Sequence, residues 1–345
     1  MFAGVEFGVG AAPDDHLRTA AQRVVAGGAV GVQVRSVRHG LVRTASAGVS
    51  DLATQREVCT EGRFRIGRAT QSIVATVVLQ LVAEGRLHLD APLRRHLPGL
   101  VPADGEITVR MLLQHTSGLH DHLRSVRLGG ADFAGHRYRH YDERELVALS
   151  TAEPLDFAPG TGWCHSATNY TVLGLVVERV TSRPWRAEVA HRVFRPLGMR
   201  CSSAPGDSVR IPGRHAQGYL PVHGSPVDVT ELRPSWAGAA GELISTTADL
   251  DRFLVALAQG RLLPRDLLAE MTTALPHSAG HGLGLVRRTT PCGVVLWGHR
   301  GGLPGFATAA FTSLDGTRRV VASATTGHGP SAADLYGLVD AAVGG

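Results

Sequence analysis

The chain has 345 residues, of which 43% are hydrophobic and 19% are charged, a composition typical of a compact globular protein rather than a disordered one. Its formal net charge is +5 and it contains no lysine, so no lysine can act as a general base or form a Schiff base. The arginines are spread along the chain and no nucleic-acid motif is present, so we expect no nucleic-acid partner.

The cysteines and the apolar segments give an expectation for the cellular location of the protein. The four cysteines are far apart and form no C-x-x-C pair, which argues against a zinc knuckle or a disulfide framework. No apolar run is long enough to span a membrane, and the N-terminus has no signal-peptide pattern. We therefore expect a cytoplasmic protein with reduced thiols and no membrane partner, and the oligomeric state stays open.

The first third of the chain predicts one helix, a hairpin and a second helix. Apolar residues at helical spacing predict a helix over residues 14–27. Two β-rich runs, residues 29–37 and 41–49, flank His39-Gly40 and predict a hairpin. An extended FRI segment then reaches Gly67, and a long apolar run predicts a helix from about residue 70 to 84 that ends at Gly85.

The remaining elements divide into a helical middle and a β-rich end. Helical patterns occupy residues 107–115, 170–182 and 247–260, whereas residues 201–234 are rich in Gly, Pro and Ser and predict loop. Strand patterns follow at 282–288, 293–299, 307–313 and 318–325, and a helix is expected over 332–343. This order predicts an α+β fold, with an antiparallel sheet built from both termini and a large helical insert. We expect one domain over residues 1–345, with a sheet part at about 1–66 and 275–345 and a helical part at about 67–274.

Six segments, in the same order, resemble the serine β-lactamase / DD-peptidase / esterase superfamily in its class C-like branch. They are FRIG (64–67), ITVRMLLQHTSGL (107–119), PGTGWCHSATNYTVLGLVVERVTSRPW (159–185), GELISTTADLDRFLVAL (241–257), GLGL (282–285) and WGHRGGLPGF (297–306). The resemblance covers roughly residues 22–326. It implies a β-lactamase/transpeptidase-like fold with an active site in a groove between the sheet and the helical part.

The family's chemistry uses Ser-x-x-Lys at a helix start, Tyr-x-Asn on a loop, and Lys-Thr-Gly or His-x-Gly on an edge strand. In this chain Arg68 and Gln71 stand where the resemblance implies Ser and Lys, and His165-Ser166-Ala167 replaces Tyr-x-Asn. The His-x-Gly pattern is kept from His299 onward. We therefore interpret the chain as a divergent member that lacks the Ser-x-x-Lys and Tyr-x-Asn residues.

The replacements are polar residues with chemistry of their own. Arg68 cannot be a nucleophile or a base, but its guanidinium suits a carboxylate or phosphate at a helix N-terminus; alternatively it fills the vacated space and pairs with an acid. Gln71 either holds a substrate amide or carbonyl or satisfies a neighbouring protein group. His165 is the expected acid/base residue, since imidazole titrates near neutrality; alternatively it only packs there. His299 is expected to orient a substrate or donate to a developing oxyanion.

The predicted site has these members in full. We expect His165, His299 and Arg68 to be catalytic, and substrate to contact Gln71, Ser166, Arg300, Gly301 and Gly302. Cys164 is interpreted as structural, because neighbours in an extended segment point opposite ways. The histidines at 115, 120, 122, 136 and 140 match no metal-ligand spacing, so no metal and no cofactor is predicted.

Three functions stay open. The first is an enzyme that acts without a serine nucleophile on a small anionic or carbonyl-bearing metabolite, by cyclisation, isomerisation, elimination or hydrolysis in a biosynthetic pathway. The second is a pseudoenzyme that binds a ligand in the old groove without converting it. The third is a serine hydrolase with an unconventional nucleophile such as Ser166 or Ser72. In each case the expected partner is a small molecule.

Overall fold

The computed structural model describes residues 12–13, 15–126, 130–327 and 335–344. Within these residues the chain forms a seven-stranded sheet in the order β1-β3-β2-β11-β10-β9-β8, in which all pairs are antiparallel except β1 with β3. The strands are β1 (Ala12–Pro13), β2 (Ala29–Arg38), β3 (Leu41–Gly48), β8 (Val286–Thr289), β9 (Val295–Leu303), β10 (Phe306–Thr312) and β11 (Arg318–Thr326). The predicted sheet built from both ends of the chain is confirmed.

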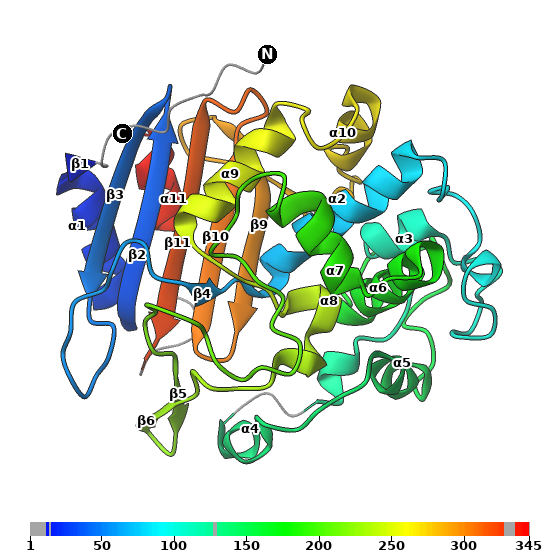
Figure 1. Ribbon diagram of the computed structural model, residues 1–345, viewed down its shortest axis with the longest axis horizontal. Coiled ribbons are helices and arrows are strands. Elements are labelled where there is room, and N and C mark those ends of the chain that lie inside the picture. Colours follow the sequence, from blue (N-terminus) through cyan, green and yellow to red (C-terminus); the bar gives the residue numbers. More distant parts are fainter. Residues whose placement is uncertain (1–11, 14, 127–129, 328–334, 345) are drawn as a thin grey trace.

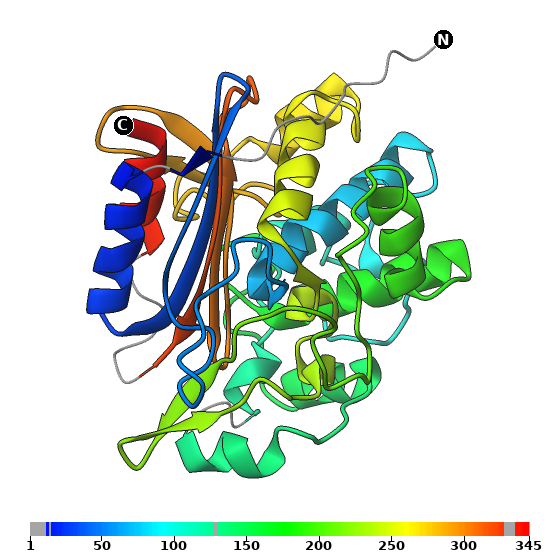
Figure 2. The same ribbon diagram turned by 60° about the vertical axis from the view of Figure 1, so that its left-hand side comes forward.

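Two helices cover one face of this sheet, and most of the remaining helices lie beyond the other face (Figures 1 and 2). The first face carries α1 (Asp15–Ala26) and α11 (Leu335–Gly344), whose apolar residues pack on β2, β10 and β11. On the other side are α2 (Thr70–Ala83), α3 (Val109–Leu113), α4 (Gly130–His136), α5 (Glu143–Thr151), α6 (Ala167–Thr181), α7 (Trp185–Val189), α8 (Gly238–Gly241), α9 (Thr247–Ala258) and α10 (Arg265–Met271). The α+β architecture with a helical insert is thus confirmed.

Helix α2 lies at the centre of the larger core because it is apolar on nearly every side. Of its residues, only Gln80, Val82 and Ala83 are not buried. Ile73, Val77 and Leu81 lie in one cluster with α6 and α9. A helix that is apolar all round has no face for solvent, so it is enclosed by other elements. The buried α2 therefore holds its N-terminal turn in a fixed place next to the sheet.

Strand β9 touches the turn that precedes α2 through glycine backbones. A Cβ built on Gly301 would lie 1.8 Å from the carbonyl oxygen of Ile66, and one on Gly67 would lie 2.6 Å from the nitrogen of Gly302. Gly67 also has φ +54°, a conformation that side chains disfavour. Only glycines permit this approach, which places Arg68 beside the strand that carries His299.

Two sequence expectations need correction. Residues 201–234 are not only loop: they contain a hairpin of β5 (Tyr219–Val222) and β6 (Ser225–Asp228). The strand expected over 282–288 is limited to β8 from Val286, because Gly284 takes φ +78° and interrupts the extended run. A further short pair, β4 (Phe64–Arg65) with β7 (Ile244–Ser245), ties the FRIG segment to the helical part. Residue 14 and residues 332–334, which were expected to be helical, lie outside the described residues.

Candidate active site

The structure brings together three of the segments that the sequence singled out. Arg68 lies in a single 3₁₀ turn (Gly67–Ala69) that leads into α2, and Gln71 lies in the first turn of α2. His165 directly precedes Ser166, the N-cap of α6, and His299 lies on β9. Arg68 is exposed, His165 is partly exposed, and Gln71 and His299 are buried. The floor of the site is therefore buried, and its rim is accessible to solvent.

Gln71 links two histidines, and the surrounding bonds fix the protons. The backbone N–H of Ser166 donates to Nδ1 of His115 at 3.3 Å, so this nitrogen must be an acceptor. In the neutral imidazole Nε2 of His115 then carries the hydrogen, and it donates to Oε1 of Gln71 at 3.2 Å. The amide nitrogen of Gln71 consequently faces Nε2 of His165 at 3.3 Å and donates to it. Gln71 thus satisfies neighbouring groups, as one of its two interpretations expected.

His165 is held between that amide and a carboxylate. Because its Nε2 accepts from Gln71, Nδ1 of neutral His165 carries the hydrogen and faces Oδ2 of Asp121 at 3.8 Å, which is longer than a hydrogen bond but close enough for electrostatic stabilisation. Asp121 is fixed by the N–H groups of Leu123 and Ala167, which both donate to its Oδ1 at 3.1 Å. The start of α6 therefore positions the carboxylate beside the imidazole.

His299 is oriented by its own strand. Its Nδ1 lies 2.6 Å from the carbonyl oxygen of Arg300, which can only accept, so Nδ1 carries the hydrogen and Nε2 of neutral His299 is an acceptor. This arrangement corrects the expectation that His299 donates to an oxyanion, because its N–H is already used.

The other predicted residues have separate places. Arg300 is exposed with its guanidinium 5.7 Å from the ring centre of Tyr336 on α11, and its charge still reaches Arg68 and His281. Gly301 and Gly302 form the contact of β9 with the turn before α2.

Serine and cysteine side chains in the site are engaged elsewhere. The Ser166 hydroxyl donates to the carbonyl of His120 at 3.3 Å, and the Ser72 hydroxyl donates to the carbonyl of Gly284 at 2.8 Å. Arg124 donates to the sulfur of Cys164 at 3.4 Å. Ser166 is nearly inaccessible, at 1% exposure. This placement does not support Ser166 as a substrate contact.

Sequence reasoning missed three members of the site. His115, Asp121 and His281 were not among the expected site residues, yet the rings of His115 and His165 are 4.5 Å apart and those of His281 and His299 are 5.9 Å apart. Trp163 closes the cluster, 4.8 Å from the ring of His281. A sequence motif identifies residues that are neighbours along the chain. These contacts join separate loops, so the motifs did not identify them. Within the described part of the chain, no three His, Cys, Asp or Glu side chains are arranged to hold a metal ion.

Burial keeps the imidazoles uncharged. It lowers the pKa of His299 to about 3 and of His281 to about 4, and the pKa of His115 lies well below its ordinary value for the same reason. Burial also lowers the pKa of His165, and Asp121 raises it by a smaller amount. At neutral pH the fixed charges nearby are therefore Arg68, Arg300 and Asp121.

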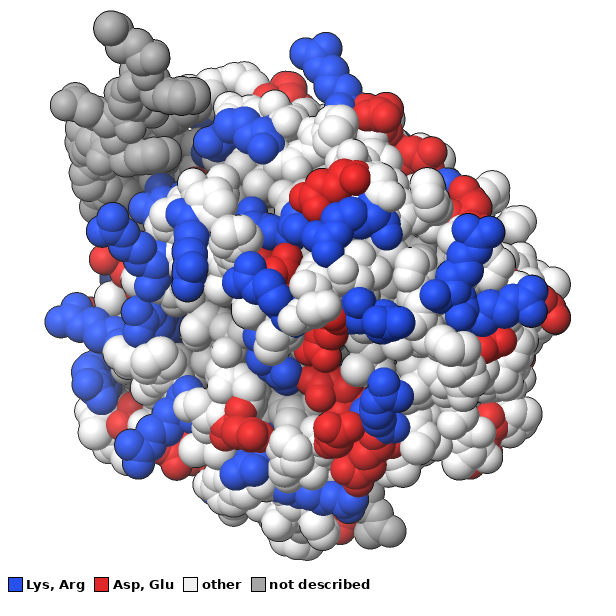
Figure 3. Space-filling view, turned by 45° about the vertical axis from the view of Figure 1, so that its right-hand side comes forward, with Lys and Arg blue, Asp and Glu red and all other residues white. Residues whose placement is uncertain are grey.

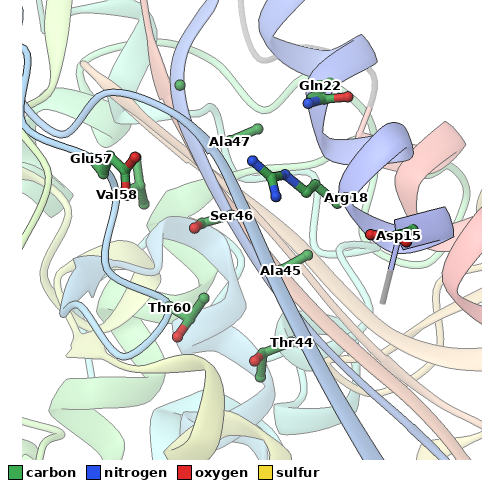
Figure 4. A pocket seen from close by; sticks show the side chains of 11 residues that line it. Asp15, Arg18, Gln22, Thr44, Ala45, Ser46, Ala47, Glu57, Val58 and Thr60 are labelled. Atoms are coloured by element: carbon green, nitrogen blue, oxygen red, sulfur yellow. The ribbon is translucent and has the colours of Figure 1, made fainter. Parts of the chain in front are cut away.

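Two surface features lie apart from this cluster. A cavity of about 410 Å³ is lined by Arg18 and Gln22 of α1, by β3 and by Glu57, with Arg18 extending from α1 over β3 (Figure 4). Three strands separate β3 from β9, so it is a different location. On the face drawn in Figure 3, arginine and acidic side chains are interspersed rather than gathered by sign. Among the described residues, none of the helices is both long and apolar enough to cross a membrane.

Comparison with known proteins places this geometry in a family context. The β-lactamase family model matches residues 17–343. The esterase EstB of Burkholderia gladioli is 42% identical over 50% of this chain and 46% of its own length, and penicillin-binding protein 4 of Amycolatopsis lactamdurans is 32% identical over 69% and 60%. The chain thus spans about half of the first relative and three fifths of the second.

Solved structures match over nearly the whole chain. A D-stereospecific amidohydrolase from Streptomyces sp. superposes with a TM-score of 0.89 and 36% identity, covering 95% of this chain and 97% of its own. The D-amino acid amidase of Ochrobactrum anthropi SV3, complexed with L-phenylalanine amide, gives a TM-score of 0.83 and 28% identity over 96% and 97%.

Proposed function

Because the chain belongs to the β-lactamase family, we propose that it uses the family's site for proton-transfer chemistry on a small anionic or carbonyl-bearing metabolite, without an acyl-serine intermediate. The observation that carries this proposal is the environment of His165. Its neutral ring is held between Gln71 and Asp121 and remains partly exposed, next to the exposed Arg68. The reaction would be a cyclisation, isomerisation, elimination or hydrolysis within a biosynthetic pathway.

His165 is the proton carrier in this proposal. Its lone pair is on Nε2, which accepts from Gln71 at 3.3 Å, so this contact is exchanged for one to the substrate when the ring takes a proton. The imidazolium that forms is stabilised by the carboxylate of Asp121, 3.8 Å from Nδ1. The carboxylate acts on the proton transfer through His165, so Asp121 is a positioning residue.

Arg68 supplies the positive charge. It lies at the N-terminal end of α2, where backbone N–H groups also favour an anion, and its electrostatic neighbours are Asp121 and Arg300. A guanidinium binds a carboxylate through two parallel hydrogen bonds, and it can also donate to a single enolate oxygen. It would therefore hold an anionic group of the substrate within reach of His165.

A first test separates this mechanism from an acyl-serine one. The purified protein is incubated with a fluorophosphonate probe, and its intact mass is measured by mass spectrometry. In a separate assay it is incubated with D- and L-amino acid amides and with p-nitrophenyl esters to detect turnover. We expect no covalent adduct, because the hydroxyls of Ser72 and Ser166 are committed to carbonyl oxygens. A stoichiometric adduct on either serine would favour the unconventional serine hydrolase and exclude our proposal.

A second test addresses His165 itself. With any compound that is converted, His165→Ala should abolish turnover, and Asp121→Asn should lower kcat more than it raises KM, because the carboxylate stabilises only the charged imidazole. His16→Gln, an exposed change on α1, is the matched control. Full activity in His165→Ala would refute the mechanism.

A second candidate function is ligand binding without conversion. It is favoured by one observation: Gln71 donates to the basic Nε2 of His165 and accepts from Nε2 of His115. A site that only binds a ligand can keep both of these hydrogen bonds, because His165 then takes up no proton. A thermal-shift screen of carboxylates and amides tests it. Stabilising ligands that are recovered unchanged after long incubation would support this pseudoenzyme, whereas any product would exclude it.

A further inference from the structure

A second cavity, of about 670 Å³, takes no part in the proposed chemistry. It lies between the loop that follows β3, drawn in blue below that strand in Figure 1, and the segment that leads into β5. Its lining includes Arg56, Glu57, Cys59, Arg214, His215 and Gln217, and no lining residue belongs to the candidate active site. The cavity is therefore a separate location with its own side chains.

Backbone hydrogen bonds fix both walls of this cavity. The N–H and the hydroxyl of Ser50 both donate to the carbonyl of Arg56, at 2.6 and 3.0 Å. The N–H of Gln217, on the other wall, donates to the carbonyl of Ser50 at 2.7 Å. The N–H of Arg63 donates to the carbonyl of Arg214 at 2.8 Å and joins the walls a second time. The positions from which the side chains extend are thus set before any ligand binds.

Two guanidiniums border the cavity without a protein partner. Arg56 belongs to one wall and Arg214 to the other, and both side chains are exposed. Within the described residues, neither side chain makes a hydrogen bond or an ion pair. Glu57 also lines the cavity, but it pairs with neither arginine in the part of the chain that the structure describes. Both guanidiniums can therefore turn toward one ligand without breaking a contact within the protein.

We propose that this cavity is a binding site for a phosphate monoester, whose phosphate is held by Arg56 and Arg214 together. A carboxylate has two oxygens, and a single guanidinium already engages both of them. A phosphate monoester has three terminal oxygens and nearly two negative charges at neutral pH, so it accepts from two guanidiniums at once. In a chain without lysine, arginine is the side chain that remains for this recognition.

The phosphate group alone should bind weakly and in a salt-dependent way. Both arginine side chains are ordered when the anion binds, which costs conformational entropy, so we expect a Kd in the millimolar range for inorganic phosphate. Because both groups are exposed, added salt screens their attraction for the anion and weakens binding. The volume of the cavity also leaves room for the organic part of the ester.

The test uses the thiol of Cys59, which lines the same cavity and is partly exposed. Its alkylation in the full chain is followed by peptide mass spectrometry with iodoacetate, an anion, and with iodoacetamide, which is neutral. Both reagents attack the same thiolate, so the ratio of the two rate constants cancels the accessibility of the thiol. Cys201, exposed and outside the cavity, gives the reference ratio. At low salt we expect the ratio at Cys59 to exceed the reference by about tenfold.

Phosphate and charge variants then identify the groups that attract the anion. Inorganic phosphate at millimolar concentration should return the Cys59 ratio to the Cys201 value, whereas acetate at the same ionic strength should not. Arg56→Gln and Arg214→Gln should each lower the Cys59 ratio by about threefold, and the double variant should bring it to the reference value. Arg144→Gln, an exposed change of the same charge on α5, is the matched control.

A Cys59 ratio equal to that of Cys201 in the wild-type chain would overturn the proposal, as would a raised ratio that survives the double variant. Acetate that competes as well as phosphate would overturn the assignment to a phosphate ester. The site does not rest on the proposed function: Arg68→Gln removes the cation of the candidate active site and should leave the Cys59 ratio unchanged. A chain without any turnover therefore keeps this site if the ratio is raised.

Discussion

The uncharged histidine cluster predicts a steep loss of stability in mild acid. In the unfolded chain a histidine titrates near its ordinary pKa of 6.5, whereas burial lowers the pKa of His299 to about 3 in the folded protein. Below pH 6.5 the unfolded chain therefore binds a proton that the folded chain does not, and stability falls as the pH falls. Between about pH 7.5 and about pH 5 the loss is about 2 kcal/mol for His299. His281, whose pKa burial lowers to about 4, contributes about the same.

The assay is urea unfolding at both pH values, with wild-type protein and His299→Asn. The side-chain Nδ2 of asparagine can donate to the carbonyl of Arg300 in place of the histidine Nδ1, and asparagine does not titrate. We expect the variant to lose about 2 kcal/mol less than the wild type over this pH interval, whatever its stability at the higher pH. His16→Gln, exposed on α1, is the control and should keep the wild-type difference. An unchanged pH dependence in His299→Asn would refute the claim that this imidazole folds uncharged.

Three further predictions concern buried contacts, two of them at the site, and each is measured by urea unfolding at neutral pH. Gln71→Leu removes the acceptor of the buried N–H of His115 and should cost about 2 kcal/mol; a loss under about 0.5 kcal/mol would contradict the assigned network. Gly301→Ala should cost about 3 kcal/mol or more, because its Cβ would overlap a carbonyl oxygen, while Gly302→Ala, with open space around it, should cost under about 1 kcal/mol; a reversed order would mean that the strand contact is misplaced. Glu242→Gln should cost about 3 kcal/mol, because the fully buried carboxylate accepts two hydrogen bonds, of 2.6 and 2.8 Å, from the guanidinium of Arg186. An unchanged free energy of unfolding would show that this ion pair does not stabilise the fold.

Regular patterns explain why most of the fold was predictable from the sequence. The apolar run that ends at Gly85 gave α2 almost to the residue, because a helix buried on all sides needs no polar face. The β2–β3 hairpin was found through His39-Gly40, which adopts φ values of 47° and 85°, typical of a tight hairpin turn. His223-Gly224 turns the β5–β6 hairpin with nearly the same values, 50° and 80°, but it was missed. Prolines in both of its strands made the segment read as loop.

The site was predictable only in part, for a different reason. Motif spacing identified Gln71, His165 and His299, and the structure brings them into one cluster with Arg68 at its rim. It did not identify Asp121 or His281 as site residues, because neither belongs to a family motif and their contacts cross long stretches of chain. The direction in which each histidine donates was also beyond the sequence, since it depends on one backbone N–H and one carbonyl oxygen.

The residues at positions 71 and 165 act as a unit. Gln71 accepts from Nε2 of His115 and donates to Nε2 of His165, which requires one acceptor and one donor on the same side chain. Lysine, which the resemblance implies at position 71, has donors only. Its N–H groups would face the N–H of His115 and leave that donor without an acceptor. Its ammonium would also stand among imidazoles that burial keeps uncharged. A residue that merely filled a vacated space would not need to complete this network. The fit of Gln71 between its two partners therefore supports a site that has been rebuilt as a set, with His165 as its exposed member.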